Sequence, residues 1–489
     1  MPTFRRIIAS VLLFALTFVA PPRTEAYGIL THQMLIDITW ETSIVPVLQH
    51  YFPDATEKEI LNSRAYVYGG ALIQDSGYYK SEKPYMADVT HYIRPGDFVV
   101  NLFRNVTCVE ELAFAIGALS HYIGDIYGHR YATNPTVFQK FPGLAVDSVP
   151  LVPATSVTYV QGKTEHTRVE FGFDVNGLAH HRLAPGSFHQ AVGIDVAYKQ
   201  YALAFYQTYG VAEDFLDPKN DFKGDAYHWT AFHALPYVAR SQVKQSKWKD
   251  SDEGEGEAQR TLVSITDCIS RHEDWNSFPW QPTPADVIAG HLLNTVPKLQ
   301  LVPVDPISQE NYAHSVLLAI TAFSHILNVA LHPVAASDKT THTFVPYYRG
   351  DAAADPAHPL ANINLDTGFD EPHFAYHLTD SAYFTLLQHL AEHPDYPVPE
   401  DIRADVLDYF DGATNRLSYE KKEEIYHERV ADVAWLKSIK GSDQSVPYPA
   451  FTTGKLKERD VEPFKPSGSG CNPSTFLPLQ QLVTGNHVP

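Results

Sequence analysis

The chain has 489 residues, a hydrophobic fraction of 44% and a formal net charge of −20. This composition is that of a globular protein, which excludes a disordered chain, and the length favours more than one domain. The acidic balance and the lack of a basic run argue against a nucleic-acid-binding surface. They do not exclude an anionic substrate, because bound cations can reverse the local charge of a site.

The first 26 residues have the pattern of a secretory signal peptide. Two arginines precede an apolar run over residues 7–20, and small residues occupy the −3 and −1 positions before Tyr27. The run is short for a membrane span, and no later segment reaches about eighteen uncharged apolar residues. We therefore expect a secreted or extracytoplasmic protein whose mature chain begins at Tyr27 after cleavage at Ala26, with cleavage near Ala20 as the alternative.

Two helices are expected next, over residues 31–50 and 57–69, and Thr31 is a possible cap of the first. Asp75 then follows a pair of glycines and lies at a predicted turn. His91 falls in a stretch that we interpret as irregular or as a short extended piece.

Residues 110–130 predict a central helix, because apolar residues recur there at intervals of four and three. His121, Asp125 and His129 recur at intervals of four and form a second stripe that lies roughly opposite the apolar one. Three glycines accompany this stripe, and each costs about 1 kcal/mol in a helix, so we expect close approach by another segment. Nitrogen and oxygen ligands one turn apart suit zinc; the alternative is a set of core histidines bonded to backbone carbonyls.

Beyond the central helix, residues 135–159 show no helical period and predict loop or short strands. His166 and Glu170 repeat the spacing of four, which is compatible with a metal site or with an ordinary surface pair. Another helix is expected over residues 190–209. The charged, glycine-containing stretch 241–258 is the predicted linker.

The region 259–440 is predicted to be mostly helical. The expected helices cover residues 260–272, 284–293, 309–331, 374–392 and 399–409. Residues 319–325 echo residues 115–121, but Val329 stands where Asp125 would be, so we expect a buried helix of similar packing, with an ancient duplication as the lesser alternative.

The pairs His373 with His377 and His389 with His393 are interpreted as surface or packing residues, a second metal site being the lesser alternative. Residues 441–489 form a polar tail that we expect to be poorly ordered.

Three cysteines, Cys108, Cys268 and Cys471, allow at most one disulfide. Asn105 begins a glycosylation acceptor sequence, which predicts a glycoprotein in a eukaryotic host.

The candidate ligands in chain order are Tyr27, His32, Asp75, His91, His121, Asp125, His129, His166 and Glu170. Their order and spacing resemble the zinc-dependent phospholipase C family, whose superfamily includes the secreted single-strand-specific nucleases. The resemblance covers about residues 27–237. Tyr27 replaces the tryptophan usual at the mature N-terminus. Three residues separate Asp125 from His129. This spacing is most similar to that in the phospholipase-like domain of glycosylphosphatidylinositol-specific phospholipase D, since the nucleases and bacterial phospholipases have five residues there.

The resemblance implies about three zinc ions and assigns ligands to each. Tyr27, through its α-amino nitrogen and carbonyl oxygen, would share one zinc with His32 and Asp125. Asp75, His91, His121 and a bridging Asp125 would hold the second zinc. The third zinc would be bound by His129, His166 and Glu170.

The predicted fold is mainly α: a multi-helical phospholipase C/nuclease-like catalytic domain over residues 27–240, followed by a second, mostly helical region of unknown role. The predicted function is a secreted phosphodiesterase that hydrolyses phospholipids in the manner of a phospholipase C through a tri-zinc site and metal-activated water. Asp75 is the predicted catalytic residue, which orients or deprotonates that water. The expected partner is a phospholipid or other phosphodiester, with transient contact to a membrane surface. The alternatives are a single-strand nuclease or nucleotidase, whose partner is nucleic acid, and a non-catalytic secreted binding protein with a structural metal site.

Overall fold

The computed structural model describes residues 27–79, 84–142, 163–180, 182–184, 189, 192–213, 256–270, 301–331, 343–350, 353–370, 372–413 and 423–443. The predicted signal peptide, most of the predicted linker, the helix expected over residues 284–293 and nearly all of the predicted tail lie outside these residues. Extended chain within them is limited to isolated bridges, such as Tyr348 with Leu360 and Asn364 with Phe369. The mainly α, multi-helical fold expected from the sequence is confirmed.

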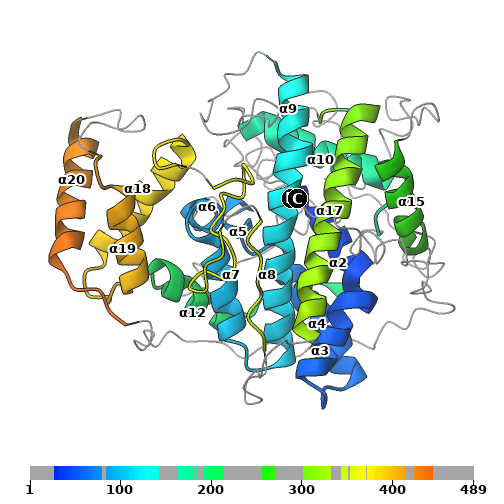
Figure 1. Ribbon diagram of the computed structural model, residues 1–489, viewed down its shortest axis with the longest axis horizontal. Helices are drawn as coiled ribbons and strands as arrows, with labels where there is room; N and C mark the ends of the chain where they lie inside the picture. Colours follow the sequence, from blue (N-terminus) through cyan, green and yellow to red (C-terminus); the bar gives the residue numbers. More distant parts are fainter. Residues whose placement is uncertain are drawn as a thin grey trace, which may run out of the picture.

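The helices of the first half surround one long helix, α8 (Figure 1). They are α2 (Ile29–Thr39), α3 (Val45–Tyr51), α4 (Glu57–Gly70), α5 (Ser76–Tyr79), α6 (Pro84–Tyr92), α7 (Pro95–Arg104), α8 (Val109–Gly128), α9 (Asn134–Lys140), α10 (Lys163–Ala179) and α12 (Tyr198–Tyr209). Two short π-helical segments, Trp40–Ile44 and His129–Thr133, join α2 to α3 and α8 to α9. Nearly every side chain of α8 is buried, so this helix forms the centre of the core.

Two glycines allow α4 and α8 to pack with their backbones in contact. A Cβ atom at Gly117 would lie 2.1 Å from the carbonyl oxygen of Val67, and one at Gly70 would lie 1.9 Å from that of Phe114. Both distances are too short for any side chain, so each position needs glycine. The close approach expected beside the central helix is therefore found, and it fixes the turn after α4 against α8.

Helix α2 begins earlier than the sequence indicates, and Thr31 is not its cap. The backbone N–H groups of Leu30 and Thr31 donate to the carboxylate of Asp174 on α10, at 2.9 and 3.0 Å, and the Thr31 hydroxyl donates to the same group at 2.7 Å. A side chain from a distant helix thus satisfies the free donors at this helix end. Local capping rules consider only neighbouring residues and miss such a contact.

Three further expectations were wrong. His91 lies on helix α6, because packing against α5, α7 and α18 overrides the low helix propensity of β-branched residues in this stretch. The start of the predicted loop is also helical: Pro135 occupies the first turn of α9, where its missing N–H costs nothing. The helix expected from residue 190 begins only at Tyr198.

The second half supplies α15 (Glu257–Ser270), α17 (Pro306–Leu331), α18 (His377–Glu392), α19 (Glu400–Tyr409) and α20 (Glu423–Ser438). Helix α17 is long and apolar enough to cross a membrane by length and composition alone, but it packs against α8, α2 and α15 inside the molecule (Figure 1). His325, within its echo of the central helix, is exposed, so this position does not share the burial of His121.

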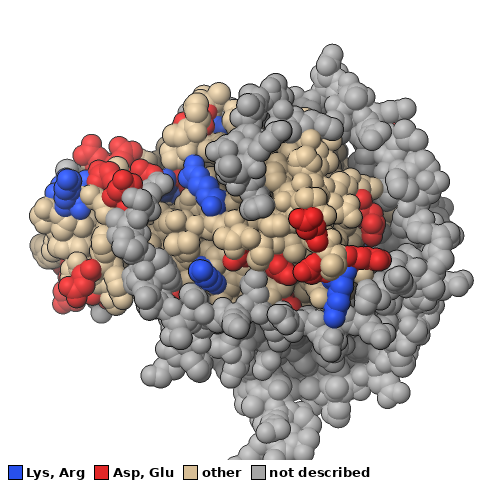
Figure 2. All heavy atoms as spheres, turned by 90° about the horizontal axis from the view of Figure 1, so that it is seen from below, with Lys and Arg blue, Asp and Glu red and all other residues tan. Residues whose placement is uncertain are grey.

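Helices α18, α19 and α20 form a group at one end of the molecule, with α18 packed on α6 (Figure 1). Acidic side chains gather over this end on the face shown in Figure 2. Helix α20 was not expected from the sequence, because its hydrophobic residues show almost no helical periodicity.

The predictions made for the cysteines and for the glycosylation acceptor stay predictions for the most part. Cys108 forms no disulfide, and the side chains of Cys268 and Cys471 lie outside the described residues. The Asn105 amide nitrogen donates to Asn101 O at 2.7 Å and to Gln207 Oε1 at 2.6 Å, and its glycosylation stays a prediction.

Candidate metal centre

Five predicted ligands from four segments meet at one buried cluster. Helix α8 contributes His121 and Asp125, one turn apart, α2 contributes His32, and α6 contributes His91. Asp75 comes from the turn after α4. Each of the five residues is at most 1% exposed. Such burial of polar groups is costly unless they are paired or bind a metal.

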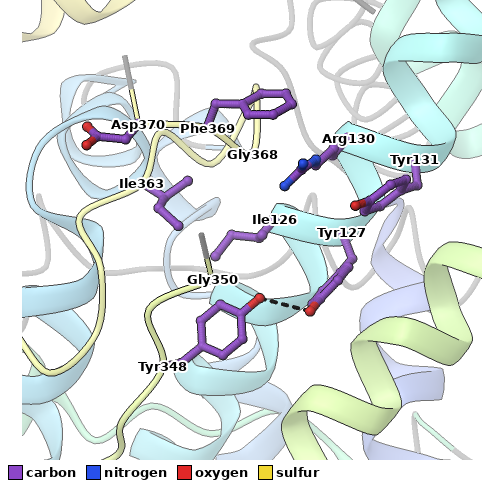
Figure 3. A pocket seen from close by; sticks show the side chains of 10 residues that line it. All are labelled: Ile126, Tyr127, Arg130, Tyr131, Tyr348, Gly350, Ile363, Gly368, Phe369 and Asp370. Carbon is purple, nitrogen blue, oxygen red and sulfur yellow. Dashed lines mark hydrogen bonds between the residues drawn. The ribbon is translucent and has the colours of Figure 1, made fainter. Parts of the chain in front are cut away.

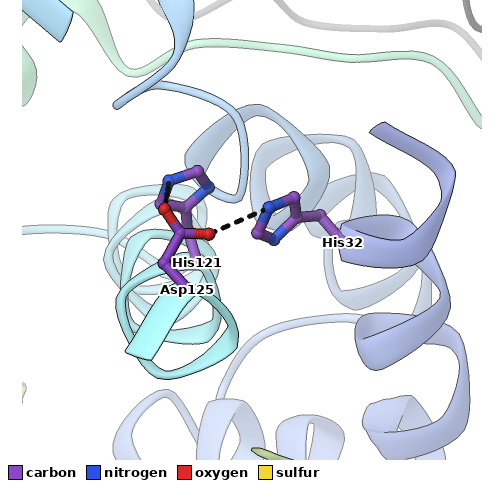
Figure 4. A group of neighbouring side chains, drawn as sticks. All are labelled: His32, His121 and Asp125. Carbon is purple, nitrogen blue, oxygen red and sulfur yellow. Dashed lines mark ion pairs between the residues drawn. The ribbon is translucent and has the colours of Figure 1, made fainter. Parts of the chain in front are cut away.

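Asp125 lies at the centre of this cluster and faces three imidazoles. Its Oδ1 is 3.3 Å from His32 Nε2, and its Oδ2 is 3.1 Å from His121 Nε2 and 3.4 Å from His91 Nε2. Figure 4 shows His32 and His121 on either side of this carboxylate. His91 Nε2 also lies 3.2 Å from Asp75 Oδ1. The carboxylate of Asp125 therefore connects two groups of donor atoms, as a bridging ligand would.

These separations are those of ligands around an ion. A charge-assisted hydrogen bond is shorter, at about 2.7–2.9 Å, whereas two ligands at about 2.0–2.1 Å from one tetrahedral zinc lie roughly 3.3 Å apart. The facing atoms have no hydrogen-bond partner: Nε2 of His32, His91 and His121, Oδ1 of Asp75 and both oxygens of Asp125. The donor set thus fits a divalent cation, and two groups within it have metal-site geometry: His32, His121 and Asp125, and Asp75, His91 and His121.

Backbone carbonyls orient two of the imidazoles. His121 Nδ1 donates to Ala71 O at 2.8 Å, and His91 Nδ1 donates to Ala87 O at 2.7 Å. With the proton on Nδ1, the lone pair of Nε2 points toward the carboxylates. The alternative of core histidines bonded to carbonyls accounts for one nitrogen of each ring and leaves the other without a partner.

The cluster favours a positive charge between its members. The pKa of Asp125 is well below its usual value, because His121, His32 and His91 together outweigh the opposing effect of burial. Burial also opposes protonation of His91, but Asp125 and Asp75 outweigh it and raise the pKa of His91 well above its usual value. Burial and the neighbouring His121 lower the pKa of His32, so the carboxylates favour a positive charge on the side of His91 and His121.

The three ligands predicted for the third zinc are also buried, which excludes an exposed surface pair for His166 and Glu170. His129 opens the π-helical segment after α8, and its ring centroid lies 6.0 Å from that of His166. Burial lowers the pKa of His129 to about 3, so its ring is neutral. Neither ring nitrogen of His129 has a hydrogen-bond partner. Glu170 follows His166 by one turn of α10.

Tyr27, the predicted mature N-terminus, is fully buried beside His32, with ring centroids 5.8 Å apart. Its hydroxyl donates to Ser315 Oγ on α17 at 2.7 Å, and its ring packs edge-on against Tyr312. Helix α17 therefore holds Tyr27 next to His32 and the cluster.

A pocket of about 260 Å³ lies beside the end of α8 (Figure 3). Its lining includes Arg130, Tyr127, Tyr348, Phe369 and Asp370. The Arg130 guanidinium lies 4.3 Å from the Phe369 ring centre, and the Tyr348 hydroxyl donates to that of Tyr127 at 2.9 Å. Arg130 follows His129 directly in the chain, but none of the nine predicted ligands lines this pocket.

Sequence reasoning missed two polar residues at this site. Asn134 Oδ1 lies 2.9 Å from His166 Nε2, and Asp366 Oδ1 lies 3.6 Å from His129 Nε2. The only local indication for either was the position of Asn134 just after the central helix. The two metal-capable groups among the described residues include neither the C-terminal pairs His373 with His377 and His389 with His393 nor the predicted third-zinc ligands His129, His166 and Glu170.

A comparison with protein-family models matches residues 26–216 to the family described as zinc dependent phospholipase C. No curated protein matches the chain, and no solved structure does. The matched region contains all nine predicted ligands and helices α2 to α12. Over residues 26–216 the chain therefore matches the zinc-dependent phospholipase C family.

Proposed function

We propose that this protein is a secreted, tri-zinc phosphodiesterase that hydrolyses phospholipids in the manner of a phospholipase C. One observation carries the proposal: imidazole Nε2 atoms and carboxylate oxygens face each other at 3.1–3.4 Å, fully buried and without hydrogen bonds. The family match supports zinc as the ion and a phospholipid as the substrate.

In this proposal the nine predicted ligands bind three zinc ions. Tyr27, His32 and Asp125 would hold one zinc, Asp75, His91, His121 and Asp125 a second, and His129, His166 and Glu170 a third. Zinc at such a site lowers the pKa of a bound water and neutralises phosphoryl oxygens. Asp75 would orient or deprotonate the attacking water, since its Oδ1 points toward the cluster without a hydrogen-bond donor of its own.

Secretion follows, in this proposal, from the predicted signal peptide and from the place of Tyr27. Cleavage after Ala26 would free the α-amino group of a residue that is already buried beside His32. A protein that keeps one additional residue before Tyr27 should therefore bind less zinc than the mature form.

A zwitterionic lipid is the substrate that we favour. The net charge of −20 would repel an anionic membrane surface, and the pocket beside the end of α8 combines one cationic and one anionic side chain, Arg130 and Asp370, with aromatic rings. The same aromatic lining supports the second candidate, a single-strand nuclease, because bases stack on such rings.

The test uses mature protein that begins at Tyr27, with hydrolysis measured on phosphatidylcholine micelles and on single-stranded DNA. Lipid hydrolysis by the zinc-containing wild type that Asp75→Asn abolishes supports the proposal; DNA hydrolysis alone supports the nuclease. Asp380→Asn is the matched control, because Asp380 is a buried carboxylate that accepts a hydrogen bond from Tyr409 within the α18–α20 group. Zinc-bound, folded protein that hydrolyses neither substrate would favour the non-catalytic binding protein.

A further inference from the structure

The side chain of Tyr27, the predicted first residue of the mature chain, fills a closely fitting space. It is fully buried, and its ring lies edge-on to those of His32 and Tyr312, with centroids 5.8 and 5.9 Å away. The ring also lies against α8 at Gly128, where a Cβ atom would come within 2.9 Å of it. Helices α2, α8 and α17 together therefore fix the position of this ring.

The hydroxyl group of Tyr27 has a partner in the second half of the chain. It donates to Ser315 Oγ at 2.7 Å, and Ser315 Oγ in turn donates to the carbonyl oxygen of Tyr312 at 2.8 Å. Ser315 is fully buried and lies outside the family match over residues 26–216. A buried tyrosine hydroxyl needs a hydrogen-bond partner, and α17 supplies it here.

The backbone that follows Tyr27 is held by one carboxylate of α10. Asp174 Oδ2 accepts from the N–H of Leu30 at 2.9 Å, and its Oδ1 accepts from the N–H and the hydroxyl of Thr31 at 3.0 and 2.7 Å. A Cβ atom at Gly28 would lie 2.3 Å from Oδ2 of Asp174, so the carboxylate can approach this closely only because residue 28 is glycine. Asp174, which is fully buried, therefore holds the chain immediately after Tyr27.

These contacts fix the part of the chain that carries the ligands of one predicted zinc. His32 follows directly, and its Nε2 lies 3.3 Å from Oδ1 of Asp125. His32, His121 and Asp125 form one of the two groups with metal-site geometry. A chain terminus is ordinarily poorly ordered unless it is tied down, and a ligand that is held in place before the metal binds costs less to order. A terminal amine that is to bind a metal therefore needs contacts of this kind.

The start of α2 is held more firmly than a helix cap requires. An ordinary cap is one side chain next to the helix in sequence, whereas here the carboxylate comes from α10 and a second contact comes from α17. Both of these helices pack on α2. Asp174 also follows Glu170, a predicted ligand of the third zinc, by one turn of α10. The same helix thus carries a predicted ligand and the group that holds the chain after Tyr27.

We propose that Asp174 and Ser315 are positioning residues of the metal centre. They hold Tyr27 so that the α-amino group freed by cleavage after Ala26 meets His32 and Asp125 at one zinc ion. This inference rests on the proposed function, because it assumes both the cleavage and the bound zinc. It gives α17, in the second region of the chain, a part in building the metal centre.

The test is a cycle of four proteins: the mature chain and a chain that keeps Ala26, each with Asp174 and with Asp174→Asn. Asparagine keeps the size of the side chain but only one of the two acceptor oxygens. Elemental analysis after dialysis against a series of chelator concentrations measures how tightly each zinc ion is held. The melting temperature of each metal-free protein measures its stability separately.

In the mature chain, Asp174→Asn should weaken the binding of one zinc ion by about 10–100-fold. Retention of Ala26 should weaken that binding by about tenfold or more in wild type. In Asp174→Asn the same retention should weaken it by less than about twofold, because both changes act through the same ligand and their effects are then not additive.

Asp380→Asn is the control, in which retention of Ala26 should cost as much zinc affinity as in wild type. Ser315→Ala repeats the cycle from the second half of the chain, and it provides the test if Asp174→Asn does not fold. An equal cost of retaining Ala26 in wild type and in Asp174→Asn would mean that Asp174 only caps α2, and it would overturn the inference. The absence of any cost in wild type would also overturn it. Neither result affects the hydrolysis of phospholipid that the proposed function predicts, whereas wild type without zinc would overturn both.

Discussion

His121 Nε2 lies 3.1 Å from Oδ2 of Asp125, one turn away on the same buried helix, and neither atom has a hydrogen-bond partner. The other ring nitrogen, Nδ1 of His121, donates to the carbonyl oxygen of Ala71 in the turn after α4. The His121 ring is thus oriented by the backbone, and Asp125 is placed beside it by the spacing of one helical turn. A preformed arrangement of this kind costs little reorganisation when a metal binds.

The bridging position of Asp125 predicts that its loss affects more than one metal. Asp125→Asn should remove at least one zinc ion per chain and abolish hydrolysis, because the carboxylate faces His32, His91 and His121 together. Elemental analysis of the purified variant measures this loss. Full zinc content in Asp125→Asn would show that this carboxylate is not a bridging ligand.

Removal of metal should destabilise the protein without a general loss of helix. Zinc that binds only the folded state adds about 2.7 kcal/mol per site at a hundredfold excess over its dissociation constant. A chelator should therefore lower the melting temperature, and added zinc should restore it, while far-ultraviolet circular dichroism at 25 °C stays close to that of the holo form. Unfolding on chelation at 25 °C would instead indicate a structural metal site.

Gly117→Ala should destabilise the protein although alanine favours helix. The new Cβ would lie 2.1 Å from Val67 O, and backbone atoms of α4 cannot move aside without displacing the turn that carries Asp75. We expect a loss of at least about 2 kcal/mol in the free energy of unfolding, which exceeds the gain of about 1 kcal/mol in helix propensity. Urea denaturation of the metal-free variant measures it, and a stability equal to that of wild type would mean that the two helices separate easily.

The pair of His358 and Asp97 predicts a dependence of stability on pH. His358 Nδ1 lies 2.8 Å from Asp97 Oδ1, and hydrogen bonding to that carboxylate raises the pKa of His358 above 6.5 despite partial burial. Burial raises the pKa of Asp97, but His358 and Arg94 outweigh it and lower that pKa below 3.8.

The raised histidine pKa stabilises the fold fully below pH 6.5, and this contribution is lost as the pH rises through the folded value. The lowered Asp97 pKa contributes above pH 3.8 and is lost as the pH falls through the folded value. His358→Gln should therefore cost most between these limits, by about 1 kcal/mol or less, and little at alkaline pH. Urea denaturation of both proteins at pH 5.5 and pH 9 measures the difference, and an equal cost at both values would contradict the ion pair.

The sequence predicted the helices whose boundaries are set locally. Helix α4 starts where expected because Thr56 and Glu59 form a capping box, with reciprocal side-chain and backbone bonds. Helix α8 was recognised from its apolar stripe and ends in a π-helical turn that no periodicity indicates. The nine predicted ligands are all described and buried, and their binding of zinc stays a prediction.

What the sequence could not predict depends on contacts between distant residues. The cap of α2 comes from Asp174, which is 143 positions away from Thr31. Asp366 is held by Tyr92, 274 positions away, and lies in a segment with no periodic pattern. Neither residue stands out by its neighbours, so only the folded arrangement identifies its role.

The most direct test is the zinc content of the mature protein that begins at Tyr27, measured by elemental analysis after extensive dialysis. The account predicts about three zinc ions per chain. A protein that is folded and binds no zinc would contradict it, because the buried imidazole and carboxylate atoms would then be satisfied by protons alone.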